Sequence, residues 1–259
     1  ALAYQLAEDD TERMQFADKA VEILDAWASV NVSVSGADGD LVMMYKGIHL
    51  LYAADLVLRY EGWSETGREA FLGWVRSVFL RSAEAKKTER NNHGDWGTLG
   101  AIAGAAILGD GPGVAAEIER IETRIDENID DNGELPQENL RTNSGMWYTY
   151  FALAAMTAGV QVGRNILGVD LYGYVSPGGR SIRRALDRLF FYCLDPGAWP
   201  YELPEGLAGE GSFVLAWHDD EWIFRQLARD GAQWLLRPLN PAYPVLALPD
   251  LASVRGVVI

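Results

Sequence analysis

Cysteine is almost missing from this chain of 259 residues, since Cys193 is the only one. A lone cysteine excludes an internal disulfide and a metal site built from several cysteines. Cys193 stands in the run LDRLFFYCLD, on the apolar stripe of an expected helix, so we predict that it is a small buried hydrophobic residue. The redox compartment stays open.

Positive charge and long apolar runs are also scarce. The formal net charge is −15, and only four of the 22 basic residues are lysines. Such a field repels nucleic acid and anionic membranes, although a local arginine cluster can still bind an anionic substrate. No apolar run reaches the roughly 18 residues of a membrane-spanning helix. We therefore expect neither a nucleic-acid partner nor a membrane partner.

The chain begins ALAYQLAEDD, without methionine or a signal-like core. We expect a processed product or a fragment, whose targeting peptide lies outside the sequence shown.

Helical periodicity dominates, and the alternation typical of strands is scarce. Proline and glycine clusters separate the segments, and the proline-rich tail is expected to be irregular. The predicted helices cover residues 12–29, 40–60, 65–83, 94–108, 112–130, 145–163, 180–194 and 216–236. The fold class that we predict is all-α, in one domain over residues 1–259.

Segments 94–108 and 145–163 are apolar on every side, whereas 112–130 has a single apolar stripe. A helix apolar all round has neighbours on all sides, and a one-striped helix faces water. This order predicts an inner and an outer layer joined by short hairpins, as in an α/α toroid. A helical solenoid is the alternative, but the sequence has no fixed repeat period.

Two inner helices separated by one outer helix run in the same direction. Their N-terminal ends then lie side by side, about 10 Å apart. NNHGDW begins the first of them and RTNSGMWYTY the second. Asn92, His93, Arg141 and Tyr148 are therefore expected to converge at one mouth.

Taken singly, these residues have simpler interpretations. Asn91 or Asn92 is typical of an N-cap, His93 of a first-turn hydrogen bond, and Tyr148 of packing. Together they suit proton abstraction next to a carboxylate. A helix N-terminus, an amide and an arginine neutralise the carboxylate, and positive charge near a tyrosine favours its phenolate. On a uronic acid polymer this chemistry is β-elimination, without metal or water.

Several segments resemble the alginate lyase-type polysaccharide lyases. NNHGDW is similar to their asparagine–asparagine–histidine–x–x–tryptophan signature, and ELPQENLRTNSGMWYTYFAL to their second conserved segment. GVDLYGYVSPGGRSIRRALDRL and FADKAVEILDAWAS are also similar to these proteins. The likeness covers most of residues 4–192 and fades beyond about residue 195.

The resemblance implies an incomplete α/α toroid that lacks some N-terminal helices. It implies that Tyr148 is the catalytic acid and also the base, and that His93 orients the sugar or serves as the alternative base. It implies that Asn92 and Arg141 neutralise the uronate carboxylate. An anionic polysaccharide substrate, no cofactor and a secreted or periplasmic location follow from it. One departure is Trp147, because NSGMWY replaces the family's RSLHY, and we expect a differently shaped subsite.

Three aromatic residues, Trp96, Trp147 and Tyr150, are candidates for stacking on sugar rings, although core packing fits them equally well. His49 is more typical of a helix interior, and Tyr45 and Lys46 beside it are within reach of a cleft. The cluster WHDDEW at 217–222 has metal-like composition, but an acidic helix start is the preferred interpretation.

Two other functions remain open at this stage. A glycoside hydrolase needs two carboxylates about 5 to 10 Å apart, and Asp95 is the only acid within the first motif. A non-catalytic carbohydrate-binding relative is the third possibility. The choice among mannuronate, guluronate and glucuronate, endo or exo action and the oligomeric state stay undetermined.

Overall fold

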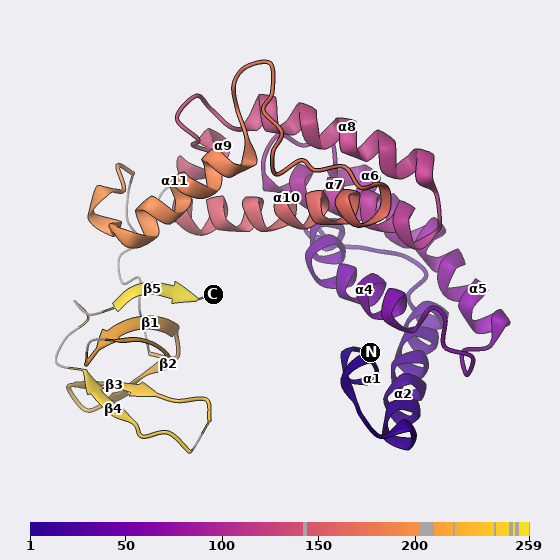
Figure 1. The fold of residues 1–259 in the computed structure, drawn as a ribbon, viewed down its shortest axis with the longest axis horizontal. Coiled ribbons are helices and arrows are strands. Elements are labelled where there is room, and N and C mark those ends of the chain that lie inside the picture. Colours follow the sequence, from indigo (N-terminus) through magenta and orange to yellow (C-terminus); the bar gives the residue numbers. More distant parts are fainter. Residues whose placement is uncertain are drawn as a thin grey trace.

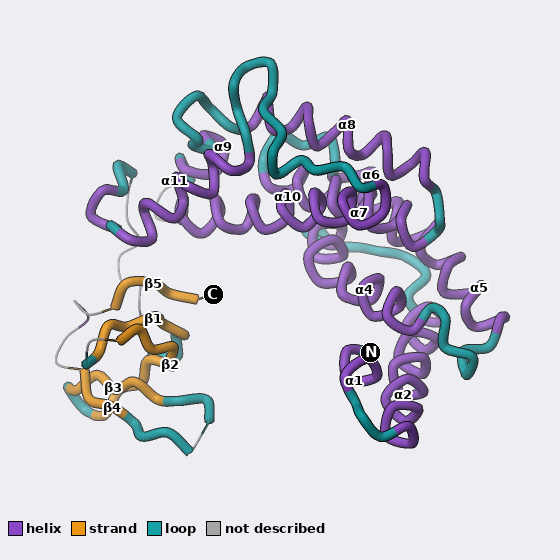
Figure 2. Tube along the Cα trace, in the orientation of Figure 1, coloured by secondary structure: helices purple, strands orange, loops and turns teal. Residues whose placement is uncertain are grey.

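The computed structural model describes residues 1–141, 144–201, 210–219, 221–240, 242–248, 251 and 254–258. A series of helices is followed by a small antiparallel sheet (Figures 1 and 2). The helices are α1 (Leu2–Leu6), α2 (Asp10–Val30), α3 (Gly39–Val42), α4 (Ile48–Val57), α5 (Glu65–Trp74), α6 (Leu80–Lys86), α7 (Asn92–Ile107), α8 (Gly111–Asn128), α9 (Pro136–Asn139), α10 (Gly145–Leu167) and α11 (Ile182–Leu194). Two π-helical turns, η1 (Met43–Gly47) and η2 (Val75–Phe79), and a 3-10 turn, η4 (Pro196–Ala198), complete this part.

Side-chain caps set where the main helices begin. The side chains of Asp9, Asn91, Asp110 and Ser181 each accept a hydrogen bond from an amide of the following first turn. Such a bond satisfies one of the amides that a helix start leaves unpaired. The helices predicted at 12–29, 94–108, 112–130, 145–163 and 180–194 are confirmed, with small shifts at their ends. Those predicted at 40–60 and 65–83 are each divided by a π-helical turn.

The predicted layering of α7, α8 and α10 is confirmed by their contacts. Trp96 packs on Phe151 near the start of α7 and α10, and Ile102 lies beside Gly159 further along both helices. The two helices therefore run parallel. A Cβ on Gly159 would lie 3.2 Å from Ile121 of α8, so the glycine allows the outer helix to pack closely. The parallel direction brings the N-terminal ends of α7 and α10 to the same side of the molecule.

The burial of side chains also distinguishes the inner helix α7 from the outer helix α8. Most residues of α7 are buried, whereas α8 buries one stripe that includes Val114, Ile118, Ile121 and Ile125. These residues belong to one hydrophobic core that extends from α2 to α11. Helices with no polar face and helices with one thus form the inner and outer parts of the same core.

The helix predicted at 216–236 is wrong. The segment forms three antiparallel strands, and two more follow in the tail that was expected to be irregular. The strands are β1 (Phe213–His218), β2 (Glu221–Asp230), β3 (Gln233–Arg237), β4 (Leu246–Leu248) and β5 (Val254–Val258), in the order β4-β3-β2-β1-β5. In the WHDDEW cluster, His218 ends β1 and Glu221 begins β2, so the cluster is not a helix start; Asp220 lies outside the described residues. The prediction of an all-α fold is therefore correct only for the helical part.

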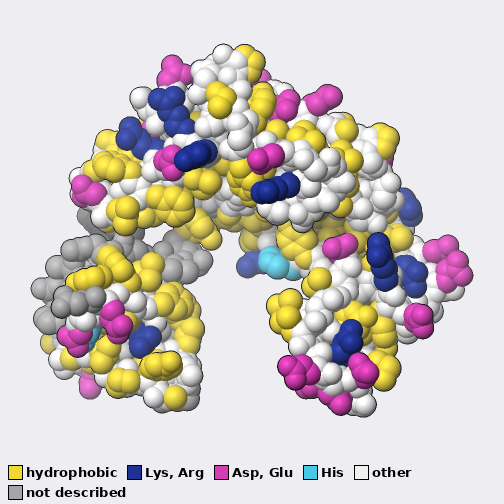
Figure 3. Space-filling view, in the orientation of Figure 1, with side chains coloured by type: hydrophobic (Ala, Val, Ile, Leu, Met, Phe, Trp, Pro, Cys, Tyr) yellow, Lys and Arg dark blue, Asp and Glu magenta, His cyan; other side chains and the backbone are white. Residues whose placement is uncertain are grey.

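The sheet has a core of its own. Val214, Ala216, Ile223, Leu227, Leu236 and Leu248 form a hydrophobic cluster separate from that of the helices. β1 has apolar residues on both faces, since Leu215 and Trp217 are exposed while Val214 and Ala216, which alternate with them, are buried. Apolar side chains are accordingly visible on the surface of the sheet (Figure 3). Apolar residues on both faces hide the period of two that would identify a strand.

Cys193 is exposed, which contradicts the prediction that it is buried. The buried face of α11 includes Leu189 and Tyr192, and the residue after Tyr192 is turned about 100° around the helix axis. Within the described ranges, no helix is both long enough and apolar enough to cross a membrane.

Candidate active site

The first predicted motif, NNHGDW, lies at the start of α7. Asn91 is the N-cap, and its side chain accepts a hydrogen bond from the His93 amide 3.0 Å away. Asn92 has no exposed surface, so it is a core residue and not the cap. The capping interpretation is therefore confirmed for Asn91 and excluded for Asn92.

Glu138 holds the buried amide of Asn92. The backbone N–H and the side-chain Nδ2 of Asn92 donate to the two Glu138 oxygens, at 2.5 and 2.8 Å. Glu138 is only 1% exposed, and the Arg141 Nη1 atom lies 3.6 Å from its Oε2. One buried carboxylate thus connects two residues that the sequence predicted to converge.

The position of Glu138 is fixed by the short helix α9 and its neighbours. Asn139 of α9 donates to Glu134, and its side-chain oxygen accepts from Thr149 of α10 at 2.5 Å. Glu134 also accepts hydrogen bonds from Tyr192 and from Arg188 of α11. Burial and the hydrogen bond to Glu134 raise the pKa of Tyr192 to about 12, so this tyrosine stays a neutral donor. The network joins α9 to the two helices that flank it.

Arg141 lies directly over the ring of Tyr148. Its guanidinium carbon is 3.9 Å from the ring centroid, which is close for a cation–π contact. Both side chains keep some exposed surface. The structure therefore brings Arg141 and Tyr148 together at one partly exposed place.

His93 is at the same helix start but has a different partner. Its Nδ1 atom lies 3.0 Å from Glu89 Oε2, in a geometry too bent for a good hydrogen bond. Burial raises the pKa of Glu89, but the hydrogen bond from Lys86 and the charges of His93 and Lys86 outweigh it and lower that pKa overall. A carboxylate on Nδ1 leaves Nε2 as the nitrogen available to a substrate.

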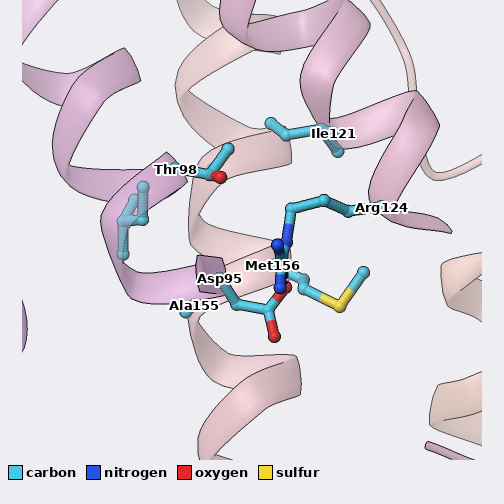
Figure 4. Close-up of a pocket in the computed structure, with 8 residues that line it drawn as sticks. Asp95, Thr98, Ile121, Arg124, Ala155 and Met156 are labelled. Atoms are coloured by element: carbon cyan, nitrogen blue, oxygen red, sulfur yellow. Dashed lines mark hydrogen bonds and ion pairs between the residues drawn. The ribbon is translucent and has the colours of Figure 1, made fainter. Parts of the chain in front are cut away.

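Arg124 of α8 fixes the chain around this helix start (Figure 4). Its Nε donates to Asp95 at 2.6 Å, and its two terminal nitrogens donate to the carbonyl oxygens of Glu89 and Asn91. Gly94 is required beside it, because a Cβ there would lie 1.9 Å from the Glu89 oxygen and 2.4 Å from the guanidinium. Asp95 and Arg124 are 3% and 7% exposed. Asp95 is therefore a structural anion and is not available as a catalytic acid.

A cavity beside this pair is too small for a sugar. Its volume is about 10 Å³, and Asp95, Thr98, Arg124 and Met156 are among the residues that line it (Figure 4). A volume of this size holds at most one water molecule.

The predicted aromatic residues divide into two groups. Trp96 and Trp147 both contact Phe151, with ring centroids 4.8 Å apart in each case, and Trp147 also contacts Tyr148. Tyr150 is 51% exposed and has no ring contact among the described residues. Residues two positions apart on a helix face different directions, so Tyr150 does not point with Tyr148. The structure thus brings Trp96 and Trp147 to the site but not Tyr150.

Glu138, Glu89 and Phe151 were not predicted as site residues. Glu138 lies three residues before Arg141 within the segment ELPQENLR, and Glu89 lies four before His93. These spacings bring side chains together on a helical turn, and they are the signal that was available. The described residues contain no group of three or more His, Cys, Asp or Glu positioned to hold a metal ion.

Burial raises the pKa of Glu138, against the hydrogen bonds from Asn92 and the charge of Arg141. The folded protein therefore binds this proton more tightly than the unfolded chain. The stabilisation that Glu138 gives is greatest at low pH and falls as the pH rises from the ordinary glutamate pKa through the raised one. We therefore expect the unfolding free energy of the wild-type chain, minus that of Glu138→Gln, to decrease as the pH rises through this range.

Denaturant unfolding at a series of pH values measures this difference, with Glu119→Gln on the exposed face of α8 as the matched control. A difference that rises with pH would contradict the raised pKa of Glu138.

The comparisons with known proteins divide at about residue 200. A family model described as Alginate lyase matches residues 1–199, and one described as Peptidase S24-like matches residues 204–259.

Solved alginate lyases have the fold of the first part. Alginate lyase A1-III from Sphingomonas species A1 is 19% identical, with a TM-score of 0.62 over 74% of this chain and 56% of its own. An alginate lyase from Bacteroides ovatus is 23% identical, with a TM-score of 0.62 over 79% of this chain and 59% of its own. A substituted form of A1-III complexed with tetrasaccharide has a TM-score of 0.63. The chain thus spans less than two thirds of each of these lyases.

A short piece of the chain is similar to a piece of several regulators. HTH-type transcriptional regulators for the conjugative elements SXT of Vibrio cholerae and pMERPH of Shewanella putrefaciens are 44% identical over 57 residues. This match covers 21% of the chain and about a quarter, 26%, of each regulator.

Proposed function

The chain belongs to the alginate lyase family, and from this premise we propose that it is a polysaccharide lyase acting on a uronate-containing polymer, alginate or a glucuronan-like chain. The observation that carries the proposal is the convergence of Asn92, Arg141 and Tyr148 around buried Glu138. The helical layering and the likeness to solved lyases support an incomplete α/α toroid around the site.

In the proposed reaction, Arg141 binds the uronate carboxylate. An arginine fork favours an anion, and the first amides of α7 already donate to Glu138 and Asn91. Neutralising the carboxylate makes the adjacent C5–H bond more acidic, because the developing enolate is stabilised. Asn92 is buried and donates its amide to Glu138, so it acts on this carboxylate only indirectly, by holding Glu138 beside Arg141.

Tyr148 then moves the proton. In its deprotonated form, Tyr148 takes the proton from C5, a double bond forms between C4 and C5, and the C4–O4 bond breaks. The same tyrosine gives the proton to the departing O4 oxygen, so atoms and charge balance without water. His93 orients the sugar through Nε2 or serves as the alternative base.

Arg141 is free to bind a ligand at this place. Its Nη1 atom has no hydrogen-bond partner among the described residues and lies 3.6 Å from Glu138 Oε2, and the side chain is 35% exposed. The guanidinium can therefore still pair with the carboxylate of a sugar.

The glycoside hydrolase alternative is weakened by the commitment of Asp95 to Arg124 and of Glu138 to Asn92. Hydrolysis requires one acid free to protonate and one carboxylate free to attack or activate water. The non-catalytic alternative remains a distinct outcome of the test below.

Whether residues 1–259 form a single domain, as the sequence predicted, stays untested. Two hydrophobic clusters and two family matches support a boundary near residue 200 instead. We assign no peptidase activity to the second part, because its match covers only about a quarter of the regulators. For the helical part, we include a secreted or periplasmic location in the proposal.

Ultraviolet absorbance tests the proposed function directly. Elimination leaves a double bond conjugated to the carboxylate, which absorbs, whereas hydrolysis leaves none. We expect absorbance to rise with one of polymannuronate, polyguluronate or glucuronan. New reducing ends without absorbance would indicate a hydrolase, and neither signal, with retained binding, would indicate a binding protein.

A further inference from the structure

A continuous row of aromatic rings leads away from Tyr148. Trp147 contacts Tyr148 at 4.7 Å, Phe151 stacks on Trp147 at 4.8 Å, and Tyr45 contacts Phe151 at 5.5 Å between centroids. We call these four residues the aromatic row; Trp96 flanks it. Each ring of the row is partly exposed, so the row is not sealed inside the core.

A cation lies at each end of the aromatic row. Arg141 covers Tyr148 at one end, and the Lys46 Nζ atom lies 5.3 Å from the Tyr45 centroid at the other. Aromatic faces attract cations and stack on sugar rings, so the row combines both kinds of contact.

Lys46 differs from the other lysines of the chain. Lys19 pairs with Glu22, Lys86 with Glu89, and Lys87 with Glu84 and Glu117. Lys46 is exposed and has no ion pair with any described residue. In a chain with a net charge of −15, an unpaired ammonium group at the end of the aromatic row is suited to an anion from outside the protein.

The backbone at Lys46 is also irregular. Tyr45 and Lys46 belong to the π-helical turn η1, between α3 and α4. A π-helical turn inserts one extra residue into a helix, redirects the side chains around it, and is frequent at functional sites. Here Tyr45 is directed onto Phe151 of α10 and Trp96 of α7. His49 follows one turn later, exposed, with its Nδ1 atom 3.0 Å from the Lys46 carbonyl oxygen.

We propose that Lys46 binds the carboxylate of a second uronate residue in the same polysaccharide chain, with the aromatic row supporting the sugars between it and Arg141. The proposal rests on the proposed function, and it adds that the protein recognises an extended polyanion through two separated cations. A neutral polysaccharide, or a uronate too short to reach both ends, lacks the second contact.

Kinetics on a ladder of oligouronates of increasing length test the proposal. We expect Lys46→Gln to raise KM about fivefold on oligomers long enough to reach both cations, with kcat unchanged and no effect on shorter ones. The effect should shrink as salt is added, because the contact is exposed. Lys46→Arg should restore KM. Lys19→Gln removes the same charge from an exposed ion pair on α2 and is the matched control.

Binding to the Tyr148→Phe variant, measured by calorimetry on the same ladder, separates this proposal from the proposed function. If the wild-type protein produces no unsaturated product, the lyase assignment fails, but a length-dependent loss of binding on adding Lys46→Gln still supports the second carboxylate site. An equal effect on oligomers of every length, or an equal effect of Lys19→Gln, would overturn it.

Discussion

Tyr148→Phe should lower the rate of double-bond formation about 100-fold to 10,000-fold, which is the usual contribution of a positioned acid–base group. The substitution removes the hydroxyl that moves the proton but keeps the ring that Arg141 and Trp147 contact. The fold and the binding of the polymer should therefore be unchanged. Initial rates of ultraviolet absorbance, with circular dichroism and calorimetric binding on the same samples, measure these quantities.

Tyr150→Phe is the matched control for this experiment. It removes the same atom from a tyrosine of the same helix that is exposed and faces another direction. Its rate should stay close to that of the wild-type protein. A Tyr148→Phe variant with full activity would show that another group moves the proton, and His93 would then be the next candidate base.

Arg124→Leu should lower the free energy of unfolding by about 3–5 kcal/mol, the usual cost of leaving one member of a buried ion pair alone. The guanidinium is the partner of buried Asp95 and of the carbonyl oxygens of Glu89 and Asn91. Without it, a carboxylate and two carbonyl groups lose their partners inside the protein. Denaturant unfolding of both proteins at neutral pH measures the loss.

The control and the rescue variant distinguish this cause from general damage to α8. Arg120→Leu lies one turn earlier, on a side chain that is 36% exposed, and should change stability by less than about 1 kcal/mol. Adding Asp95→Leu to Arg124→Leu should recover part of the loss, because the unpaired charge is then removed. A double variant less stable than Arg124→Leu alone would argue against the unpaired charge as the cause.

The helical part was largely predictable because its signals are local. One-sided stripes identify α8 and α11, while continuous apolar segments identify α7 and α10 as inner helices. The parallel direction of the inner helices followed from their order. The predicted convergence included His93, and the structure connects the other three residues through Glu138, which contacts Asn92 and Arg141, and through Arg141, which lies over Tyr148. Their roles in catalysis remain predictions.

The linking residue Glu138 was not predictable in the same way. It lies on a helix of only four residues, whose position depends on contacts with α10 and α11 that are distant in sequence. A single acid in a polar segment carries no sign that it will be buried. Its contact with Asn92 joins residues 46 positions apart, which only the folded chain reveals.

The strands were missed for a different reason. The run FVLAWH is apolar at nearly every position, and short runs of this kind do not distinguish a strand from a buried helix. The useful signal was Gly231, which has a φ of +58° and is the first of the two residues between Asp230, the end of β2, and Gln233, the start of β3. A glycine in a two-residue turn between apolar segments is typical of a hairpin, and it should have outweighed the helical interpretation.

The position of Arg124 has a consequence for how this family's motifs are inherited. Substitution of Gly94, Asp95 or Arg124 would disrupt close packing or a buried ion pair. Arg141 and Tyr148 contact each other at a partly exposed place and make no such contact in the core. A descendant that abandoned catalysis could therefore lose Tyr148 by drift while keeping NNHGDW intact. In a newly found relative, the counterparts of Gly94, Asp95 and Arg124 would report the shared fold, and the counterpart of Tyr148 would report whether the proposed chemistry has survived.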